Sequence, residues 1–295
     1  MVLQSTLLRL RPFACALAAA AVLAGCGGGG DDAGSTQLAT VSSASAGVPR
    51  YSQPLLITVN GARLDSGLTV TSAGCAGMTR STTAPNVSGD TVAYYTCTPS
   101  ALGEQTARIV RTVDSTLLQT VTFTVPEPQV TMAVSNGASV NGSMVFTLRP
   151  DLAPITVNNF LAYVNSGFYD GTIFHRVAPD FVIQGGGFTT AGTLKPPTRD
   201  PIPLEVGKGL SNVRWSLAMA RTSVPDSATS QFYVNLVDNL FLDPSPGSAG
   251  YAVFGSVTGN TALVTAIETA PCTATSATEC VPNPQAVISS AQQTR

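Results

Sequence analysis

The sequence has few charged side chains, a single histidine and no closely spaced pair of cysteines. Only 11% of its 295 residues are charged, the formal net charge is −2, and the basic residues form no cluster. Nucleic-acid binding depends on a basic surface, so we expect no nucleic-acid partner. A zinc site needs thiolate or histidine groups in clusters. Because there is no Cys-x-x-Cys pair and His175 is the only histidine, we also expect no metal.

The chain also lacks an apolar run long enough to span a bilayer as a helix. Its longest run, Phe13–Ala24, falls short of the roughly 20 residues that such a helix needs. Arg9 and Arg11 precede the run, which is the pattern of a secretory leader over residues 1–25. The leader ends in Leu23-Ala24-Gly25-Cys26, which resembles a bacterial lipobox.

A lipidated Cys26 would attach the protein to the membrane of the bacterial cell envelope. The alternative is an ordinary secreted protein in which Cys26 is incidental. Gly27 stands where an Asp would favour retention at the inner membrane, so we expect the outer membrane, facing the periplasm. Residues 26–50 are rich in Gly, Ser, Ala and Thr, and we expect them to form a flexible linker without regular structure.

Four further cysteines follow Cys26 and allow three connectivities. Pairing within each predicted domain is favoured, which joins Cys75 to Cys97 and Cys272 to Cys280. Disulfides would agree with an oxidising compartment.

Residues 51–126 are expected to form a small β-rich domain that resembles a sandwich. Runs of Val, Thr, Ile and Tyr alternate with turn signals, and Asn60-Gly61 predicts a hairpin turn. The expected strands are 55–59, 68–71, 91–97, 107–113 and 117–125. A core this thin would gain from a disulfide. The domain is either a spacer or a module that binds a partner or a substrate.

Residues 127–295 are expected to form one further domain, which begins where Pro126 and Pro128 interrupt regular structure. Strands are predicted at 130–134, 143–148 and 285–290. Apolar residues at helical spacing predict a helix over 154–166, ending at Gly167, and another over 261–269, before Pro271.

Four blocks of this second domain carry a family resemblance. They read FYDGTIFHRVAPDFVIQGGGF from Phe168, GLSNVRWSLAMART from Gly209, DSATSQFYVNLVDNLFLD from Asp226 and GYAVFGSV from Gly250. The blocks resemble the cyclophilins, the peptidyl-prolyl cis/trans isomerases, in the order that this family has them. The resemblance implies a mainly β fold: a closed eight-stranded antiparallel barrel with two covering helices, here preceded by the small β domain.

The resemblance also implies a reaction. A cyclophilin rotates the amide bond before proline in polypeptide segments of folding proteins, and it uses no cofactor. The rotation must overcome a barrier of roughly 18–20 kcal/mol without breaking a bond. The catalyst must therefore bind the twisted amide more tightly than either planar form. An apolar pocket for the proline ring and a cation near the prolyl nitrogen can do this.

The resemblance assigns these tasks to particular residues. Arg176 is the expected cation, and Phe181 and Gln184 complete the catalytic group. Gln184 is expected to donate to the substrate carbonyl. The other expected substrate contacts are Val182, Ala220, Arg221, Gln231, Tyr233, Phe241, Leu242 and Tyr251. Val182 replaces the family's usual Met and Tyr233 its usual Phe. Phe241 and Tyr251 replace a Trp and a His of many eukaryotic members, which implies weak cyclosporin binding.

Three features of these blocks have structural interpretations. His175 is expected to pack inward, because neighbours in a strand point to opposite faces and Arg176 faces the substrate. The run Gly185-Gly186-Gly187 lacks phosphate-loop spacing and suits a close backbone approach. Trp215 replaces a small residue, often Gly, and would either pack against the first domain or crowd the substrate cleft.

The leading hypothesis is a lipid-anchored isomerase that assists protein folding in the periplasm. The alternative is a non-catalytic module or chaperone that binds proline-containing segments. A structural envelope protein would not need Arg176, Phe181 and Gln184 together, and a hydrolase would need His175 for catalysis.

Overall fold

The computed structural model describes residues 37–65 and 67–295. Within these residues the fold is mainly β, with two α-helices, as the resemblance implied. The expected leader, Cys26 and the first part of the linker lie outside the described residues. The elements are β1 Thr40–Ala46, β2 Leu55–Ala62, β3 Leu68–Thr71, β4 Cys75–Arg80, β5 Val92–Pro99, β6 Gly103–Arg111, β7 Leu117–Val125, β8 Gln129–Ser135, β9 Asn141–Leu148, α1 Pro154–Asn165, β10 Thr172–Ala178, β11 Val182–Thr189, β12 Ser216–Met219, β13 Phe232–Asn235, the 3-10 helix η1 Leu240–Leu242, β14 Val253–Gly259, α2 Thr261–Glu268, β15 Cys272–Ala274, β16 Cys280–Pro282 and β17 Val287–Gln293.

The first seven strands form two antiparallel sheets, in the orders β1-β2-β5-β4 and β3-β6-β7. Buried and more exposed residues alternate along β2 and β5, as expected of strands with one face on a core. Ile57, Tyr95 and Ile109 are among the buried side chains of these sheets. Cys75 of β4 is bonded to Cys97 of β5, which is the local pairing that the sequence favours.

Two expectations for this region were wrong. The linker was expected to have no structure up to residue 50, but Thr40–Ala46 forms β1 and pairs with β2. Asn60-Gly61 was expected to form a hairpin turn, but both residues lie inside β2. The reason is a close approach between strands: a Cβ on Gly61 would lie 1.9 Å from the carbonyl oxygen of Thr40. Glycine at this position makes room for β1, and a turn is not formed.

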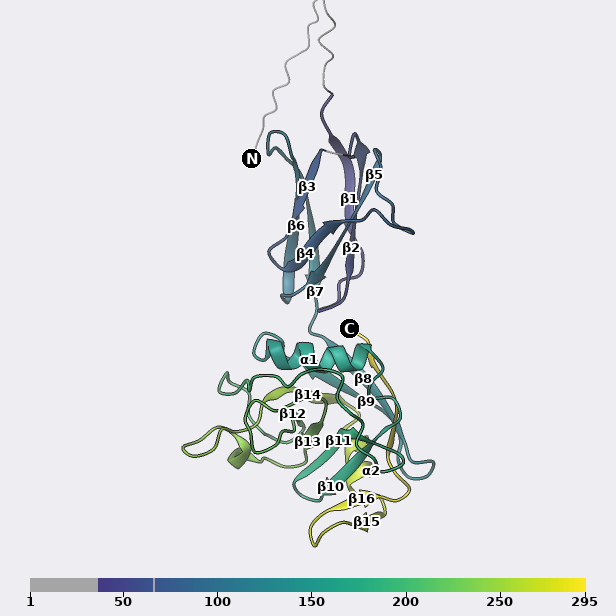
Figure 1. The fold of residues 1–295 in the computed structure, drawn as a ribbon, viewed down its shortest axis with the longest axis vertical. Helices are drawn as coiled ribbons and strands as arrows, with labels where there is room; N and C mark the ends of the chain where they lie inside the picture. Colours follow the sequence, from purple (N-terminus) through teal and green to yellow (C-terminus); the bar gives the residue numbers. More distant parts are fainter. Residues whose placement is uncertain (1–36, 66) are drawn as a thin grey trace, which may run out of the picture. The chain divides into compact units, whose positions relative to one another are not determined.

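The other long strands close into a barrel. Their order is β11-β13-β12-β14-β9-β8-β17-β10, and β10 also pairs with β11, which completes a ring of eight antiparallel strands (Figure 1). Closure leaves no unpaired sheet edge in the ring. Val125 ends β7 and Gln129 begins β8, so the predicted boundary at Pro126 and Pro128 lies between the last sandwich strand and the first barrel strand.

Both predicted helices are present and pack on the barrel with their expected faces. In α1, Val157, Phe160, Leu161 and Val164 are buried, and in α2 Leu263, Val264 and Ile267 are buried. The Phe160 ring lies 5.6 Å from Phe232 and 5.1 Å from Phe254, measured between centroids, so α1 contributes directly to the barrel core. The binding site therefore has to lie on the outside of the barrel, because its interior is filled by side chains.

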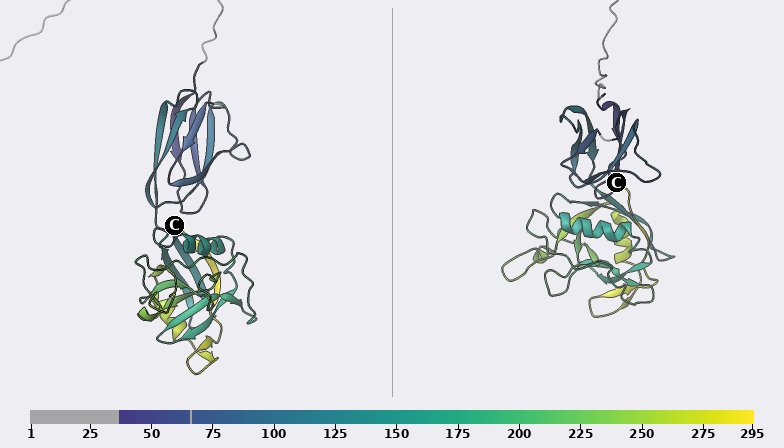
Figure 2. Two further views of the ribbon diagram at one scale, coloured as in Figure 1. Left: turned by 60° about the vertical axis from the view of Figure 1, so that its left-hand side comes forward. Right: turned by 45° about the horizontal axis from the view of Figure 1, so that its top comes forward.

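A short hairpin, β15–β16, extends the sheet beyond β10. It projects from the barrel on the side away from α1, in yellow in both views of Figure 2. Cys272 and Cys280 are bonded to each other across this hairpin, which is again the local pairing. Neither strand was predicted from the sequence.

Candidate functional site

A pocket of about 200 Å³ opens on the outer face of the barrel. Strands β10, β11 and β13 supply one side of it, and η1 and the segments after β12 and before β14 supply the other. Nine of the eleven predicted site residues line it: Arg176, Phe181, Val182, Gln184, Ala220, Arg221, Tyr233, Leu242 and Tyr251. The structure thus brings together residues that are up to 75 positions apart in the sequence (176 to 251).

Arg176 is held at the rim of this pocket by two hydrogen bonds. Its Nη1 donates to Oε1 of Gln184 at 3.2 Å, and its Nη2 donates to Oε1 of Glu279 at 2.6 Å. The guanidinium carbon also lies 5.6 Å from the centre of the Phe181 ring. Gln184 in turn donates from Nε2 to Oε1 of Gln231 at 2.9 Å. The cation is therefore fixed beside the aromatic wall, with about a third of its side chain exposed to solvent.

A β-bulge places Arg176 in this position. Phe174 pairs with Gly185 and Arg176 with Gln184, so His175 is an extra residue on β10 without an opposite partner on β11. Bulges of this kind re-aim side chains next to functional sites. His175 does not line the pocket; its ring lies 4.5 Å from that of Phe188. Burial, with a contribution from the Arg176 charge, lowers the pKa of His175 to about 4, so the ring is neutral near pH 7.

The floor of the pocket is apolar. Val182, Ala218, Tyr233 and Val253 form a small buried cluster of their own, separate from the main barrel core. The Tyr233 hydroxyl, which the family's usual Phe lacks, donates to Oδ1 of Asn212 at 2.7 Å. This hydroxyl is directed to an internal partner, so the pocket keeps an aromatic wall. Burial raises the pKa of Tyr233 well above its ordinary value, and it stays protonated.

Arg221 braces the other side of the pocket. Its Nε and Nη2 donate to the carbonyl oxygen of Gly250 at 3.0 and 2.9 Å, and its guanidinium lies 4.4 Å from the centre of the Tyr251 ring. These contacts join the segment after β12 to the segment before β14. The side chain thus shapes the wall, and the neighbouring Ala220 also lines the pocket.

Two predicted site residues lie beside this pocket. Gln231 lines an adjoining hollow together with Thr222, Ser227 and Thr229, and Gln184, Ala220 and Arg221 border both spaces. Phe241 is 70% exposed and stacks on Phe181, with ring centroids 5.8 Å apart and planes at 17°. It therefore extends the aromatic surface outward from the pocket mouth.

Three parts of the site were not predicted from the sequence: Glu279, Asn212 and the three hydroxyl residues of the adjoining hollow. Glu279 stands next to Cys280 in a segment for which no element was predicted, and only its contact with Arg176 reveals it. Asn212 lies within the second family block, but nothing in the local sequence shows that Tyr233 would use it as an acceptor. Both contacts are long-range, so no local pattern signals them.

Trp215 and the glycine run have structural explanations. Trp215 has φ of +65°, a conformation that glycine adopts most easily, which explains why a small residue is usual there. Its ring is partly buried against the core with Arg214 over it, and it does not line the pocket. A Cβ on Gly186 would lie 2.7 Å from Tyr169 and 2.9 Å from Phe232. The run thus allows the close backbone approach that was expected.

Residues 37–65 and 67–295, which the structure describes, contain no cluster of three or more metal-ligating side chains. They contain no helix that is both long enough and apolar enough to cross a membrane.

Fold and site together define a class: a closed β-barrel whose outer face joins an apolar pocket to a fixed cation, suited to hold a polypeptide segment. The sequence model described as "Cyclophilin type peptidyl-prolyl cis-trans isomerase/CLD" matches residues 129–293. The chain belongs to this family, and it is a peptidyl-prolyl cis/trans isomerase.

Curated relatives carry the same activity in their names. A peptidyl-prolyl cis-trans isomerase of Acinetobacter baylyi is 52% identical over 130 residues, which is 44% of this chain and 69% of the relative. One from Streptomyces antibioticus is 49% identical over 154 residues, which is 51% of this chain and 92% of the relative. Peptidyl-prolyl cis-trans isomerase B of Escherichia coli is 51% identical over 120 residues, covering 40% and 73%. The first seven strands lie outside the family match.

Proposed function

We propose that the pocket clamps the proline of an extended polypeptide segment while Arg176 stabilises the twisted amide. The observation that carries this proposal is the position of the guanidinium: it is fixed by Gln184 at the rim of an apolar pocket that suits a proline ring. As the amide twists, its nitrogen regains a localised lone pair, and a fixed cation stabilises that pair more than it stabilises the planar amide. Gln184 donates to the substrate carbonyl.

The required acceleration is within reach of such a site. Turnover of about 10 s⁻¹ from an uncatalysed process of about 100 s needs roughly a thousandfold acceleration, or about 4 kcal/mol. One oriented charge–dipole contact in a partly desolvated site is typically worth about 3 kcal/mol. The clamp on the proline ring supplies the remainder.

The test is a proline-isomerase assay on the chain from Gly27 to Arg295, which keeps every residue that the structure describes. Arg176→Ala should lower kcat/KM about a hundredfold, with the circular dichroism spectrum unchanged. Arg149→Ala is a matched control, because it removes a surface Arg–Asp pair away from the pocket. If Arg176→Ala turned over as fast as the wild type, the proposed role of Arg176 would be contradicted. Tight binding of a proline peptide without acceleration would instead favour the module or chaperone hypothesis.

We further propose that the enzyme is anchored by a lipid on Cys26 in the bacterial cell envelope, facing the periplasm, where it assists protein folding. The leader-like residues 1–25 and the lipobox-like end support this proposal. The two disulfides are a second support, since such bonds persist in oxidising compartments. Labelling with a radioactive fatty acid should mark the wild type, and Cys26→Ala should not be labelled. A wild type that stays unlabelled, with its leader removed, would show an ordinary secreted protein.

A further inference from the structure

Glu279 of the β15–β16 hairpin forms an ion pair with Arg176. It lies outside the four family blocks. The two side chains approach to 2.6 Å, and each is about one-third exposed. Arg176 and Glu279 are 103 positions apart in the sequence, so the fold of the hairpin alone decides whether they meet. The charge of Arg176 lowers the pKa of Glu279, mainly through this hydrogen bond, and the carboxylate is ionised at neutral pH.

The strand register explains why these side chains meet. Cys280 pairs with Val177 in an antiparallel ladder, and continuing that register places Glu279 opposite Ala178. Side chains alternate along a strand, so Arg176 and Glu279 project from the same face as diagonal neighbours. Diagonal positions are about 7–8 Å apart, a span that two long side chains bridge.

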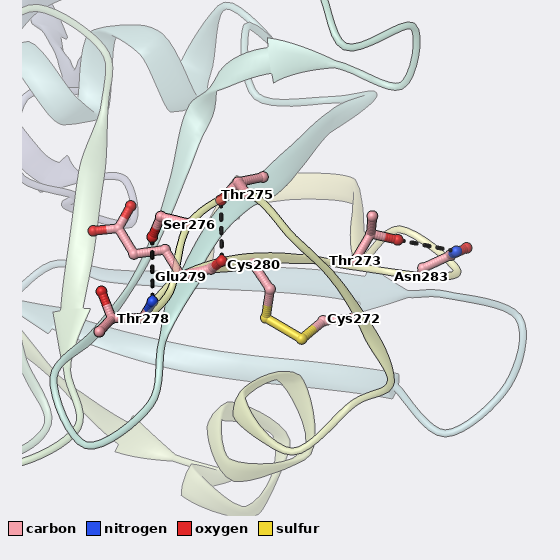
Figure 3. The surroundings of a disulfide bond; sticks show 8 residues. All are labelled: Cys272, Thr273, Thr275, Ser276, Thr278, Glu279, Cys280 and Asn283. Carbon is pink, nitrogen blue, oxygen red and sulfur yellow. Dashed lines mark hydrogen bonds between the residues drawn. A yellow bond between two sulfur atoms is a disulfide. The ribbon is translucent and has the colours of Figure 1, made fainter.

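The hairpin holds the backbone of Glu279 firmly. Its carbonyl oxygen accepts from the backbone N–H of Thr275 at 2.8 Å, from that of Ser276 at 3.2 Å and from the Thr275 hydroxyl at 3.1 Å. The next residue, Cys280, is bonded to Cys272, so the two arms of the hairpin are joined directly beside Glu279. Figure 3 shows the disulfide across the hairpin and the Glu279 side chain extending away from it.

An isolated ion pair at such exposure contributes little to stability. In this site the ion pair instead orients the side chain of Arg176. An arginine side chain has many rotamers, and a second bond to a fixed acceptor removes much of that freedom before the substrate arrives. Gln184 holds one terminal nitrogen and Glu279 holds the other, which fixes both the position and the plane of the guanidinium.

We propose that Glu279 is a positioning residue of the isomerase, acting through Arg176, and that the Cys272–Cys280 disulfide keeps it within reach. The proposal rests on the proposed role of Arg176. Since Arg176 acts on the twisted amide and the apolar pocket holds the planar one, the loss of Glu279 lowers kcat and leaves KM nearly unchanged.

The first experiment substitutes Glu279→Gln in the chain from Gly27 to Arg295. We expect kcat to fall three- to tenfold with KM within twofold of the wild type. In the Arg176→Ala background, measured at high enzyme concentration, Glu279→Gln should have no further effect. Glu104→Gln is the matched control: it removes an exposed carboxylate of β6 outside the pocket lining and should leave kcat unchanged.

The outcomes separate this proposal from the one on which it rests. If Arg176→Ala keeps its activity, the proposed mechanism fails and the positioning role fails with it. If Arg176→Ala is inactive but Glu279→Gln turns over as fast as the wild type, only the positioning role is overturned. A rise in kcat would also overturn it, because Glu279 would then restrain the enzyme by neutralising its cation.

The second experiment tests the disulfide. A dithiol such as dithiothreitol gives two electrons and two protons to the bond, which leaves two thiols and the cyclic disulfide of the reductant. In the Cys272→Ser, Cys280→Ser double variant, kcat should fall to the value measured for Glu279→Gln. Adding dithiothreitol should not lower it further. The Cys75→Ser, Cys97→Ser double variant should keep wild-type kcat until the reductant is added. Full kcat in the first double variant would overturn the role of the disulfide.

Discussion

The two disulfides in the described part of the chain join antiparallel strand pairs in different surroundings. Cys75 and Cys97 are 2% and 3% exposed and join β4 to β5 among the buried side chains of the N-terminal sheets. Cys272 is exposed, and its bond to Cys280 closes a projecting hairpin beside Arg176. We expect the first bond to affect stability, whereas the second lies next to a carboxylate that contacts Arg176.

The N-terminal sheets and the barrel also differ in where their polar side chains lie and what those side chains contact. In the N-terminal sheets, buried and more exposed residues alternate along β2 and β5, and the ion pair of Arg80 with Asp65 is partly exposed. The barrel has, besides its core, polar side chains that are oriented by hydrogen bonds around a pocket. Changes in the first region should therefore alter the free energy of unfolding, and changes around the pocket should alter the rate.

Removing the buried disulfide should have the largest effect on stability and so tests this contrast most strongly. Cys75→Ser with Cys97→Ser should lower the stability of the N-terminal sheets by about 3 kcal/mol, because the bond closes a loop of 22 residues and restricts the unfolded chain. Hydrogen exchange followed by mass spectrometry would locate the loss in β2–β7. The isomerase rate should stay at the wild-type value. A parallel loss of turnover would show that the two regions are coupled, and the contrast would be wrong.

Lowering the pH should also affect the stability of the two regions differently, since His175 is the only histidine and lies in the barrel. Its pKa is lowered to about 4 in the folded state by burial and by Arg176, so only the unfolded chain gains this proton between about pH 6.5 and 4. Barrel stability should therefore fall as the pH drops through that window. The shift corresponds to about 3 kcal/mol for a fully buried ring, and we expect about 2 kcal/mol because His175 is partly exposed.

The measurement is urea unfolding at pH 6.5, 5.5 and 4.5, followed by Trp215 fluorescence, which reports on the barrel. His175→Gln should remove the part of the pH dependence that His175 causes, and the wild-type minus variant difference isolates it from the carboxylates. An equal slope with pH in both proteins would contradict the assignment.

A smaller effect should come from the buried hydroxyl of Tyr233. Tyr233→Phe removes its bond to Asn212 and should cost about 1 kcal/mol of stability, while kcat/KM stays within twofold because the aromatic wall remains. Urea unfolding and the isomerase assay measure the two quantities. Tyr94→Phe is the control, since Tyr94 lies in β5 outside the pocket and its hydroxyl makes no hydrogen bond within the part of the chain that the structure describes. A large loss of kcat/KM in Tyr233→Phe would show that the hydroxyl contacts the substrate.

Much of the barrel could be predicted because its signals are local or carried by long motifs. The inward residues of α1 and α2 follow from helical spacing alone. Val182 and Tyr233 were placed in the pocket by the family blocks, although each differs from the usual residue. In both cases the residues that carry the signal lie within one short segment.

Predictions from the sequence were wrong or missing where contacts between distant segments determine the local structure. Asn60-Gly61 has a strong local preference for a turn, but pairing with β1 holds it extended. Thr40–Ala46 is made mostly of small residues that resemble a linker, and a bulge between Val41 and Ser43 interrupts its alternation. Glu279 has no local signal at all, since its role depends on the register between β10 and β16.

The smallest effect concerns Trp215, which lies near the site but outside the pocket and should affect stability without changing the rate. At its φ of +65° a Cβ is unfavourable, so Trp215→Gly should be more stable than Trp215→Ala by about 0.5–1 kcal/mol. In a residue with negative φ the order would be reversed, because alanine restricts the unfolded chain. Urea unfolding by circular dichroism gives the comparison, and an alanine variant at least as stable as glycine would contradict it. Wild-type kcat in both variants would place Trp215 with the residues that support the barrel, whereas a change in kcat would mean that its ring reaches the substrate path.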